Sequence, residues 1–503
     1  MKTSYVLMIV TIIAKIFGLL REKALAQFFG TAIIADVFLV AFQIPLTFTN
    51  VITGATANGY IPIYDQVKNR SNVEKANLFT SNLANIAFII STLISIVGII
   101  FARPLVKFMA IGFNEEELKL CVFMTRAALL SLGATSVFSI FKAYLQIERM
   151  FVVSVLNAIF MNIIIIVAMW FGYKTDSSYL AIGIFCSFVF QYVIFLPYIR
   201  KSGYRHKFIV DFKDKDFREM MKIIVPVLIS TSVIELNFII SKSIASAQFE
   251  GAISTLNYAY KLQTFVTGIV ITSITTAVYP EMARMGALKD YDGLRKQTSE
   301  AIFTMSLLVI PASVGLFIFA GPIVRLLFLG GAFKQSDIFP TQVALAAYAV
   351  GIIGIGVREI ISRVFYTLMD AKTPVINSII MVVLNVVLSI VLAKVWGIKG
   401  LALATSISFI IGALLIVLDL KKKIGHVITA TTAKDIIKIS IATGLMAVLS
   451  RLVFNFLFER LGSNLSLIVA IMVAGIVYLV SLLIFRPSEI NSLIEKLKNK
   501  RKK

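Results

Sequence analysis

Long apolar runs dominate the hydrophobic pattern of this chain. Runs of about 18 or more residues, long enough to cross a bilayer as helices, recur over the whole length. They lie near residues 3–20, 34–64, 76–102, 120–144, 150–172, 178–199, 220–246, 251–280, 298–319, 340–366, 374–396, 399–420, 435–458 and 464–486. Because a backbone in lipid must satisfy its own hydrogen bonds, the pattern predicts an all-α integral membrane protein of about fourteen transmembrane helices.

The polar connections between these runs predict the orientation of the chain. Alternate connections are rich in Lys and Arg, among them 68–75, 200–222, 284–296 and 421–438, and so is the end of the chain at 498–503. The opposite set is poorer in Lys and Arg and includes three consecutive glutamates, Glu115 to Glu117. Since basic loops stay in the cytoplasm, both termini are predicted to be cytoplasmic.

The sequence also contains an internal repeat. Gln43 and Pro62 recur as Lys261 and Pro280, 218 residues later, in similar Thr-rich runs. Tyr144 recurs as Tyr366 at an offset of 222 residues, each leading into another apolar run. Chance similarity between apolar helices is the alternative, but the offsets fit two pseudo-symmetric six-helix lobes in the same orientation.

This repeat predicts four parts of the chain. They are an N-terminal lobe at 1–219, a C-terminal lobe at 220–424, two additional helices at 425–490 and a basic cytoplasmic tail at 491–503. Parallel repeats are typical of transporters, whose substrate site lies where the repeats meet.

Composition excludes several other classes. Residues are 58% hydrophobic and only 15% charged, so the bilayer must be the solvent. The basic residues that give the net charge of +22 lie mostly in short loops. They are therefore better explained by the orientation of the chain in the membrane than by nucleic-acid binding. The chain has no phosphate-binding loop motif, and Cys121 and Cys186 lie inside apolar runs. His206 and His426 lie in basic loops, where we expect them to be solvated, so we predict no catalytic residue, metal site or cofactor.

Polar residues within the runs predict where a substrate binds. At 100° per residue, one face of the second run carries Asp36, Gln43, Thr47, Asn50, Gly54 and Asn58. The eighth run has a matching stripe of Ser254, Asn257, Lys261, Gly268, Thr272 and Thr275. The first run adds Lys15, Arg21 and Glu22, and the seventh adds Glu235, Asn237 and Lys242.

Two interpretations of these residues are open. Polar groups in spans either hold helices together or line a cavity. Four runs, two from each lobe, would form a central cavity with excess positive charge, which suits an anionic substrate. The tenth run differs, because Glu359 and Arg363 stand four residues apart and are expected to pair structurally, beside Arg358. Glu22, Glu235, Lys242, Arg358 and Glu359 are therefore candidates for coupling or structural charges.

Several separated segments resemble one family. Residues 15–22 read Lys-Ile-Phe-Gly-Leu-Leu-Arg-Glu, and residues 36–45 read Asp-Val-Phe-Leu-Val-Ala-Phe-Gln-Ile-Pro. Residues 327–333 read Leu-Phe-Leu-Gly-Gly-Ala-Phe, and the most specific segment is 365–374, Phe-Tyr-Thr-Leu-Met-Asp-Ala-Lys-Thr-Pro. Together these segments resemble the MurJ (MviN) family, lipid II flippases of the MOP transporter superfamily.

The resemblance implies a function and a site. It implies translocation of an undecaprenyl-pyrophosphate-linked peptidoglycan precursor across the bacterial cytoplasmic membrane, by alternating access between two lobes. It places Lys15, Arg21 and Lys261 at the basic positions of the family's cavity and Asp36 at its second-helix acid. The polar stripes add Gln43, Asn50 and Ser254 as candidate cavity residues. The implied partners are the lipid-linked saccharide and membrane lipids, with no nucleic acid, and the protein acts as a monomer.

The chain departs from the family pattern in its cations. Arginine is usual where Lys15 and Lys261 stand, and a further arginine is usual at Thr49. Lysine lacks the two-pronged grip of a guanidinium, so the identity of the glycan is the open point. A capsule or exopolysaccharide repeat-unit flippase, a cation-coupled multidrug antiporter and a membrane-embedded glycan-transfer enzyme are the alternatives. Coupling to Na⁺, H⁺ or membrane potential is also open.

Overall fold

The computed structural model of the chain describes residues 2–488 and is helical almost throughout. In this range no β-strand forms, apart from an isolated bridge between Gly330 and Phe333. The predicted all-α class is therefore confirmed. The predicted basic tail at 491–503 lies outside the described residues, as does the side chain of Asn58.

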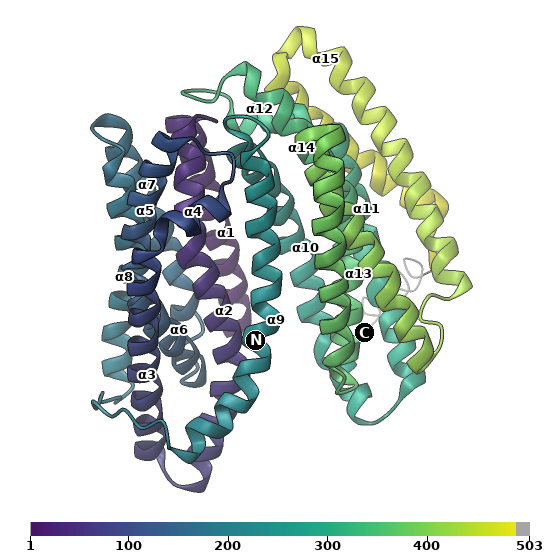
Figure 1. Ribbon diagram of the computed structural model, residues 1–503. Coiled ribbons are helices and arrows are strands. Elements are labelled where there is room, and N and C mark those ends of the chain that lie inside the picture. Colours follow the sequence, from purple (N-terminus) through teal and green to yellow (C-terminus); the bar gives the residue numbers. More distant parts are fainter. Residues whose placement is uncertain (1, 489–503) are drawn as a thin grey trace. The chain divides into compact units, whose positions relative to one another are not determined.

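The chain divides into two compact units, Met1–Ser254 with Gly330–Phe333, and Thr255–Leu329 with Lys334–Lys503. The helices that begin in the first unit are α1 (Lys2–Phe29), α2 (Ile33–Arg70), α3 (Val73–Ile100), α4 (Ala102–Met109), α5 (Glu115–Leu129), α6 (Leu132–Ile147), α7 (Val153–Lys174), α8 (Ser178–Lys201), α9 (Lys215–Ser246) and α10 (Ala252–Ala287). Most of α10 belongs to the second unit, which continues with α11 (Tyr291–Ile318), α12 (Ala320–Phe328), α13 (Gln335–Thr367), α14 (Lys372–Ile424) and α15 (Ala430–Phe485). Figure 1 shows the long helices of each unit packed as a bundle.

Two glycines split the longest helices into pairs of arms. α14 is broken at Gly397, where φ is 53°, and α15 is broken at Gly462, where φ is 71°. Glycine adopts a positive φ without a Cβ clash, so the chain can turn there. The breaks fall between the predicted runs 374–396 and 399–420, and between 435–458 and 464–486. Figure 1 shows the two arms of α15 in yellow.

Many of these helices are suited to a membrane. Among the described residues, nine helices are long and apolar enough to cross one, or up to ten if the α5–α6 pair, bent by 45°, is a single span. Each of the fourteen predicted runs falls on a helix, on one arm of α14 or α15, or on α5–α6. The number of crossings itself stays a prediction.

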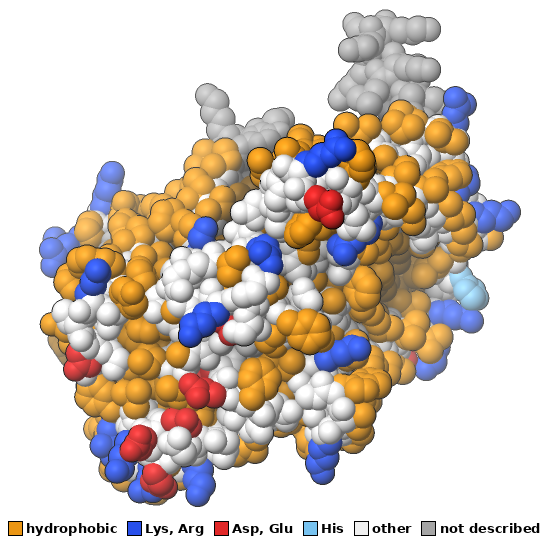
Figure 2. Space-filling model, turned by 90° about the horizontal axis from the view of Figure 1, so that it is seen from above, with side chains coloured by type: hydrophobic (Ala, Val, Ile, Leu, Met, Phe, Trp, Pro, Cys, Tyr) orange, Lys and Arg blue, Asp and Glu red, His pale blue; other side chains and the backbone are white. Residues whose placement is uncertain are grey.

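The apolar surface of the helices agrees with a lipid environment. Large hydrophobic side chains are exposed along α15, including Leu452, Phe456, Ile476 and Ile484, which are 59–70% exposed. Figure 2 shows such side chains in orange around the flanks, with charged residues scattered over the end that faces the viewer. Contiguous exposed apolar surface of this kind marks a lipid-facing region.

Local structure repeats along the chain. Phe101-Ala102-Arg103-Pro104 connects α3 to α4, and Phe319-Ala320-Gly321-Pro322 connects α11 to α12 at an offset of 218 residues. Both phenylalanines have nearly the same backbone angles, φ −94° and ψ 20° at Phe101, φ −106° and ψ 18° at Phe319. The sequence analysis did not use this segment.

A second repeated feature corrects the sequence alignment. The turns after α6 and α13 each contain a non-glycine residue with positive φ, 58° at Arg149 and 57° at Met369. These residues are 220 apart, whereas pairing Tyr144 with Tyr366 gave 222. Matching the polar side chains around the turn gave an offset two residues too long. Equivalent positions in the two turns are identified by the backbone conformation, which the side chains do not reveal.

The boundary between the units also differs from the predicted lobe boundary at 219/220. α9, which was assigned to the C-terminal lobe, belongs to the first unit. Hydrogen bonds between α9 and α2, described below, account for this placement. The division into lobes that move relative to each other stays a prediction.

The most specific sequence segment, 365–374, contains a charged turn whose stability should depend on pH. Asp370 Oδ1 accepts from the Thr373 amide at 3.0 Å, Oδ2 accepts from Thr373 Oγ1 at 2.7 Å, and Lys423 pairs with the same carboxylate. Burial acts to raise the pKa of Asp370, but these bonds outweigh it and lower the pKa to about 2.

This turn gives a testable prediction. A depressed pKa stabilises the folded state above the ordinary pKa of about 4, and the stabilisation is lost as the pH falls toward 2. Asp370→Asn should therefore lower the free energy of unfolding of the purified protein at pH 7 by about 1 kcal/mol, as is typical of a lost cap. Its melting temperature should fall accordingly. The difference between the two proteins should shrink in melting curves taken from pH 5 down to pH 3. A difference independent of pH would contradict a role for the charge.

Candidate functional site

A polar network joins α2 to α9 inside the first unit. The Glu235 carboxylate accepts from Asn50 Nδ2 at 3.0 Å and from Thr47 Oγ1 at 2.9 Å. Thr47 Oγ1 also accepts from Gln43 Nε2 at 2.9 Å, and Gln43 Oε1 accepts from Lys242 Nζ at 2.8 Å. The network therefore runs from a carboxylate to an ammonium through neutral side chains.

This network unites residues that the sequence placed on two separate stripes. Gln43, Thr47 and Asn50 follow one face of α2 because they recur at helical spacing, and Glu235 and Lys242 stand seven residues apart on α9. Glu235 is only 8% exposed and Lys242 is half-buried. A buried carboxylate needs hydrogen-bond donors, and α2 supplies them. The contacts hold two helices together, and whether the same residues touch a substrate stays a prediction.

Arg21 and Glu22 form a buried charge pair on α1. The Arg21 guanidinium pairs with the adjacent carboxylate of Glu22, and their side chains are only 8% and 1% exposed. The Arg21 Cζ atom lies 4.8 Å from the ring centre of Phe42 on α2. Stacking on an aromatic face together with an ion pair stabilises a guanidinium away from water. Arg21 is thus held in a fixed position.

Asp36 and Ser254 contact each other within the first unit. Asp36 Oδ1 accepts from the amide of Ser254 at 2.7 Å, and Oδ2 accepts from the amides of Gly251 at 3.1 Å and Ile253 at 3.4 Å. Asp36 is 1% exposed and Ser254 is fully buried. The carboxylate therefore caps the start of α10, where backbone N–H groups lack helical partners and the helix dipole favours a negative charge. These contacts give both residues a structural role, and substrate binding by either stays a prediction.

The two lysines of the predicted site belong to different units. Lys15 lies on α1 in the first unit, is half-buried, and has no hydrogen bond or ion pair within residues 2–488. Lys261 lies on α10 in the second unit and is also half-buried. A cation in a membrane helix is costly unless it faces a cavity or a partner, so both positions keep their functional interpretation.

The charges of α13 behave as the sequence indicated. Arg363 Nη2 donates to Glu359 Oε1 at 2.9 Å, which confirms the expected i,i+4 pair. Arg358 donates instead to Asn377 Oδ1, at 3.3 Å from Nε, and to Ser378 Oγ, both on α14. Arg358 therefore links α13 to α14, whereas Glu359 pairs within α13.

At the position of the family's missing arginine, Thr49 makes a local bond. Its hydroxyl donates to the carbonyl of Pro45 at 2.7 Å, one turn earlier in α2. The carbonyl of Pro45 is also the usual acceptor of the Thr49 amide, so this bond does not satisfy a carbonyl that a proline leaves unpaired. The Thr49 hydroxyl is thus satisfied within its own helix, and nothing at this position replaces the cation.

Sequence reasoning missed two groups. Lys142 on α6 is half-buried, with Nζ 5.9 Å from the ring centre of Phe138. The available signal was a cation near the end of the apolar run 120–144, which otherwise contains only Arg126 as a charged residue. His206 was expected to be solvated, and its side chain is exposed, but its hydrogen bonds were not foreseen. Tyr204 Oη lies 3.0 Å from its Nδ1, Asn85 Oδ1 lies 2.9 Å from its Nε2, and burial lowers the pKa of His206.

The loop around His206 is fixed by side chains of α3. Asn82 bonds both the amide and the carbonyl of Asp211, at 2.7 and 2.9 Å, and Asn85 donates to the carbonyls of Lys207 and Ile209. A loop without secondary structure must satisfy its backbone groups through such partners. The asparagines of α3 looked like ordinary polar residues in the sequence, because their loop partners lie more than 120 positions away.

The ammonium, guanidinium and neutral polar groups of these helices are suited to binding an anion. Within residues 2–488 no three His, Cys, Asp or Glu side chains gather as a metal site would require. What the helices carry is a set of buried and half-buried cations and polar groups within long apolar helices, on two units of repeated local structure. This combination defines a polytopic transporter built from two related helical halves.

Solved structures share this fold. The fold matches a structure titled "Lipid II flippase MurJ, inward closed conformation" with a TM-score of 0.84 and 24% identity, covering 96% of this chain and 99% of that one. It also matches an inward-facing multidrug resistance MATE family transporter of the MOP superfamily with a TM-score of 0.66 and 16% identity, covering 82% and 94%.

Sequence comparison identifies the family. The family model described as "Lipid II flippase MurJ" matches residues 25–483, so the chain belongs to the MurJ family of lipid II flippases. A protein of Rickettsia prowazekii named "Probable lipid II flippase MurJ" is 29% identical over 414 residues, 81% of each chain. The "Lipid II flippase MurJ" of Burkholderia cenocepacia is 26% identical over 423 residues, 82% of each chain.

Proposed function

We propose that this protein translocates lipid II, the lipid-linked precursor of peptidoglycan, across the bacterial cytoplasmic membrane. The observation that carries this proposal is the family match over residues 25–483, which includes α2 to α14 and most of α15. The function is transport, with no covalent step and no cofactor. We place both termini in the cytoplasm, following the basic loops.

The substrate chemistry supports the assignment of residues. A pyrophosphate that leaves water for a partly enclosed site needs its charge compensated, because isolated charges are costly at low dielectric. Lys15, Arg21 and Lys261 supply cations for this purpose. Arg21 is held by Glu22 and Phe42, whereas Lys15 has no partner within the described residues and can give its ammonium to a ligand.

The mechanism we propose is alternating access. The two compact units move relative to each other, so that cations on both units bind the pyrophosphate from one leaflet and release it to the other. Glu235 and Lys242, bridged by Gln43 and Thr47, are the candidates for coupling this movement to an ion or to the membrane potential.

The proposal is tested by complementation. Expression of this chain in a bacterium depleted of its own lipid II flippase should restore growth and clear the lipid II that accumulates in the inner leaflet. Protein content of the membrane is measured in parallel. Failure with normal membrane expression would instead favour another polyprenyl-linked glycan as substrate, which the same assay with a capsule-flippase mutant would reveal.

A further inference from the structure

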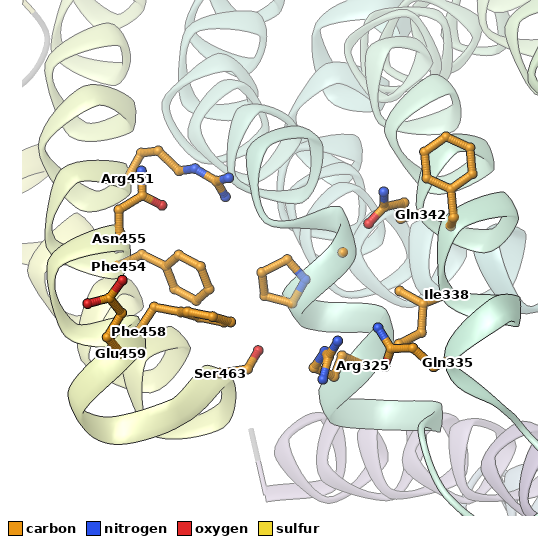
Figure 3. Close-up of a pocket in the computed structure, with 13 residues that line it drawn as sticks. Arg325, Gln335, Ile338, Gln342, Arg451, Phe454, Asn455, Phe458, Glu459 and Ser463 are labelled. Atoms are coloured by element: carbon orange, nitrogen blue, oxygen red, sulfur yellow. The ribbon is translucent and has the colours of Figure 1, made fainter.

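A polar cavity lies in the second unit. Its volume is about 560 Å³, within the range of small-ligand sites. Figure 3 shows Arg325 on α12, Gln335 and Gln342 on α13, and Arg451 and Asn455 on α15 around it. The network of α2 and α9 belongs to the first unit, so this cavity is a separate feature.

The cavity has cations with spare hydrogen-bond donors. Arg451 Nη1 donates to the carbonyl of Ile318 at 3.2 Å, which leaves most of the five guanidinium N–H groups available. The Arg325 side chain has no hydrogen bond or ion pair in the described part of the chain. Glu459 also lines the cavity, but it forms no ion pair with either arginine there. Two arginines and one glutamate give the lining a net charge of +1.

The first unit provides an internal comparison. The repeat pairs α4 with α12 at an offset of 218, so Arg103 corresponds to Gly321 and Lys107 to Arg325. α5 and α13 begin 220 residues apart, so Glu115 corresponds to Gln335.

In the first unit this place holds an ion pair. Arg103 Nη2 donates to both Glu115 oxygens, at 2.9 and 2.7 Å, beside a smaller cavity of about 260 Å³ that Lys119 and Arg126 also line. In the second unit both members of that ion pair are absent, as Gly321 and Gln335 replace them, while Arg325 stands where the first unit has Lys107. The larger cavity of the second unit is therefore not closed by this ion pair, and its arginines form no ion pair with a carboxylate among the described residues.

The surroundings of the cavity point to lipid. Arg451 stands 13 residues after Lys438, about 20 Å along the helix, on an arm of α15 whose Leu452 and Phe456 are exposed. An arginine within a membrane span is costly and marks a binding site. The exposed aromatic side chains of Phe339 and Phe458, 69% and 44% exposed, complete the lining. By the basic-loop orientation this end faces the outer leaflet.

We infer that this cavity binds the phosphate headgroup of an anionic phospholipid of the outer leaflet. The guanidiniums of Arg325 and Arg451 bind the phosphate oxygens, since arginine suits phosphate geometry, and the amides of Gln335, Gln342 and Asn455 donate further bonds. Phe339 and Phe458 contact the apolar part of the lipid. A free phosphate shares the anion chemistry but leaves these aromatic rings without a partner.

Native mass spectrometry of the full-length protein tests this site. Phosphatidylglycerol or phosphatidylcholine with identical acyl chains is titrated into the detergent-solubilised protein, and bound lipid is counted. We expect a preference for phosphatidylglycerol, and an affinity for it that is lower by about tenfold or more in the Arg325→Gln, Arg451→Gln double variant. Phosphatidylcholine, whose phosphate is balanced by a choline cation that the arginines repel, should bind weakly to both proteins. An unaltered preference in the double variant would overturn the proposal.

Two further variants keep the test decisive. Arg460→Gln, on α15 but outside the cavity, is the matched control and should bind like the wild type. Gln342→Glu keeps the side-chain shape and brings a carboxylate into the cavity, so it should also lose the preference, even if the arginine variants fold poorly. Glycerol 3-phosphate at equal concentration should not displace the lipid. Displacement would show that the site takes free phosphate esters and would overturn the lipid assignment.

Discussion

Replacing Lys15 and Lys261 together with alanine is expected to abolish lipid II flipping while folded protein stays in the membrane. Charge-assisted hydrogen bonds contribute about 1.5–3 kcal/mol each, so each single variant should lose about 10- to 100-fold of the activity. Lys15 has no partner in the described residues, so its removal should cost little stability. The measurement is the leaflet-resolved amount of lipid II, with membrane expression determined in the same cells.

Conservative and distant variants separate charge from structure. Lys15→Arg and Lys261→Arg keep the cation and should retain most of the activity, because arginine is usual at these positions in the family. Lys75→Ala removes an exposed charge in a predicted cytoplasmic loop and should do little, since salt screens such charges. Full flipping by the Lys15→Ala, Lys261→Ala double variant would show that the lysines only anchor their helices.

Asp36→Ala is expected to destabilise the protein more than most single substitutions. The variant leaves the amides of Gly251, Ile253 and Ser254 without their acceptor in a fully buried place. Loss of a cap and unsatisfied buried donors together cost about 2–4 kcal/mol. The melting temperature of the purified protein in detergent should fall clearly, with part of the loss recovered in Asp36→Asn, which keeps an accepting oxygen.

An exposed cap of the same kind serves as the control. Asp176 accepts from the amide of Ser178 at 2.8 Å at the start of α8, in contact with solvent. Asp176→Ala should therefore lower the melting temperature less than Asp36→Ala. If Asp36→Ala instead melts like the wild type but stops flipping, the carboxylate acts on the substrate rather than on α10.

The sequence by itself determined the membrane class and the helical segments. Lipid forces every backbone group to bond within its own helix, so length and hydropathy are enough to locate α2, α3, α7 and α8. The i,i+4 pair of Glu359 and Arg363 was predictable for the same reason, because it depends only on helical spacing. The cations of the predicted site were chosen because charge inside an apolar run is costly wherever the chain folds, and their role stays a prediction.

Only the tertiary structure decided which partner each polar residue has. Asp36 looked like a cavity residue on the stripe of α2, yet its carboxylate caps α10, 215 to 218 residues further along the chain. Glu235 joins Asn50 across 185 residues, and His206 joins Asn85 across 121. Helical periodicity gives the face of a side chain but not the helix packed against that face. Contacts at these separations arise from packing alone, which is also why α9 joined the first unit rather than the second.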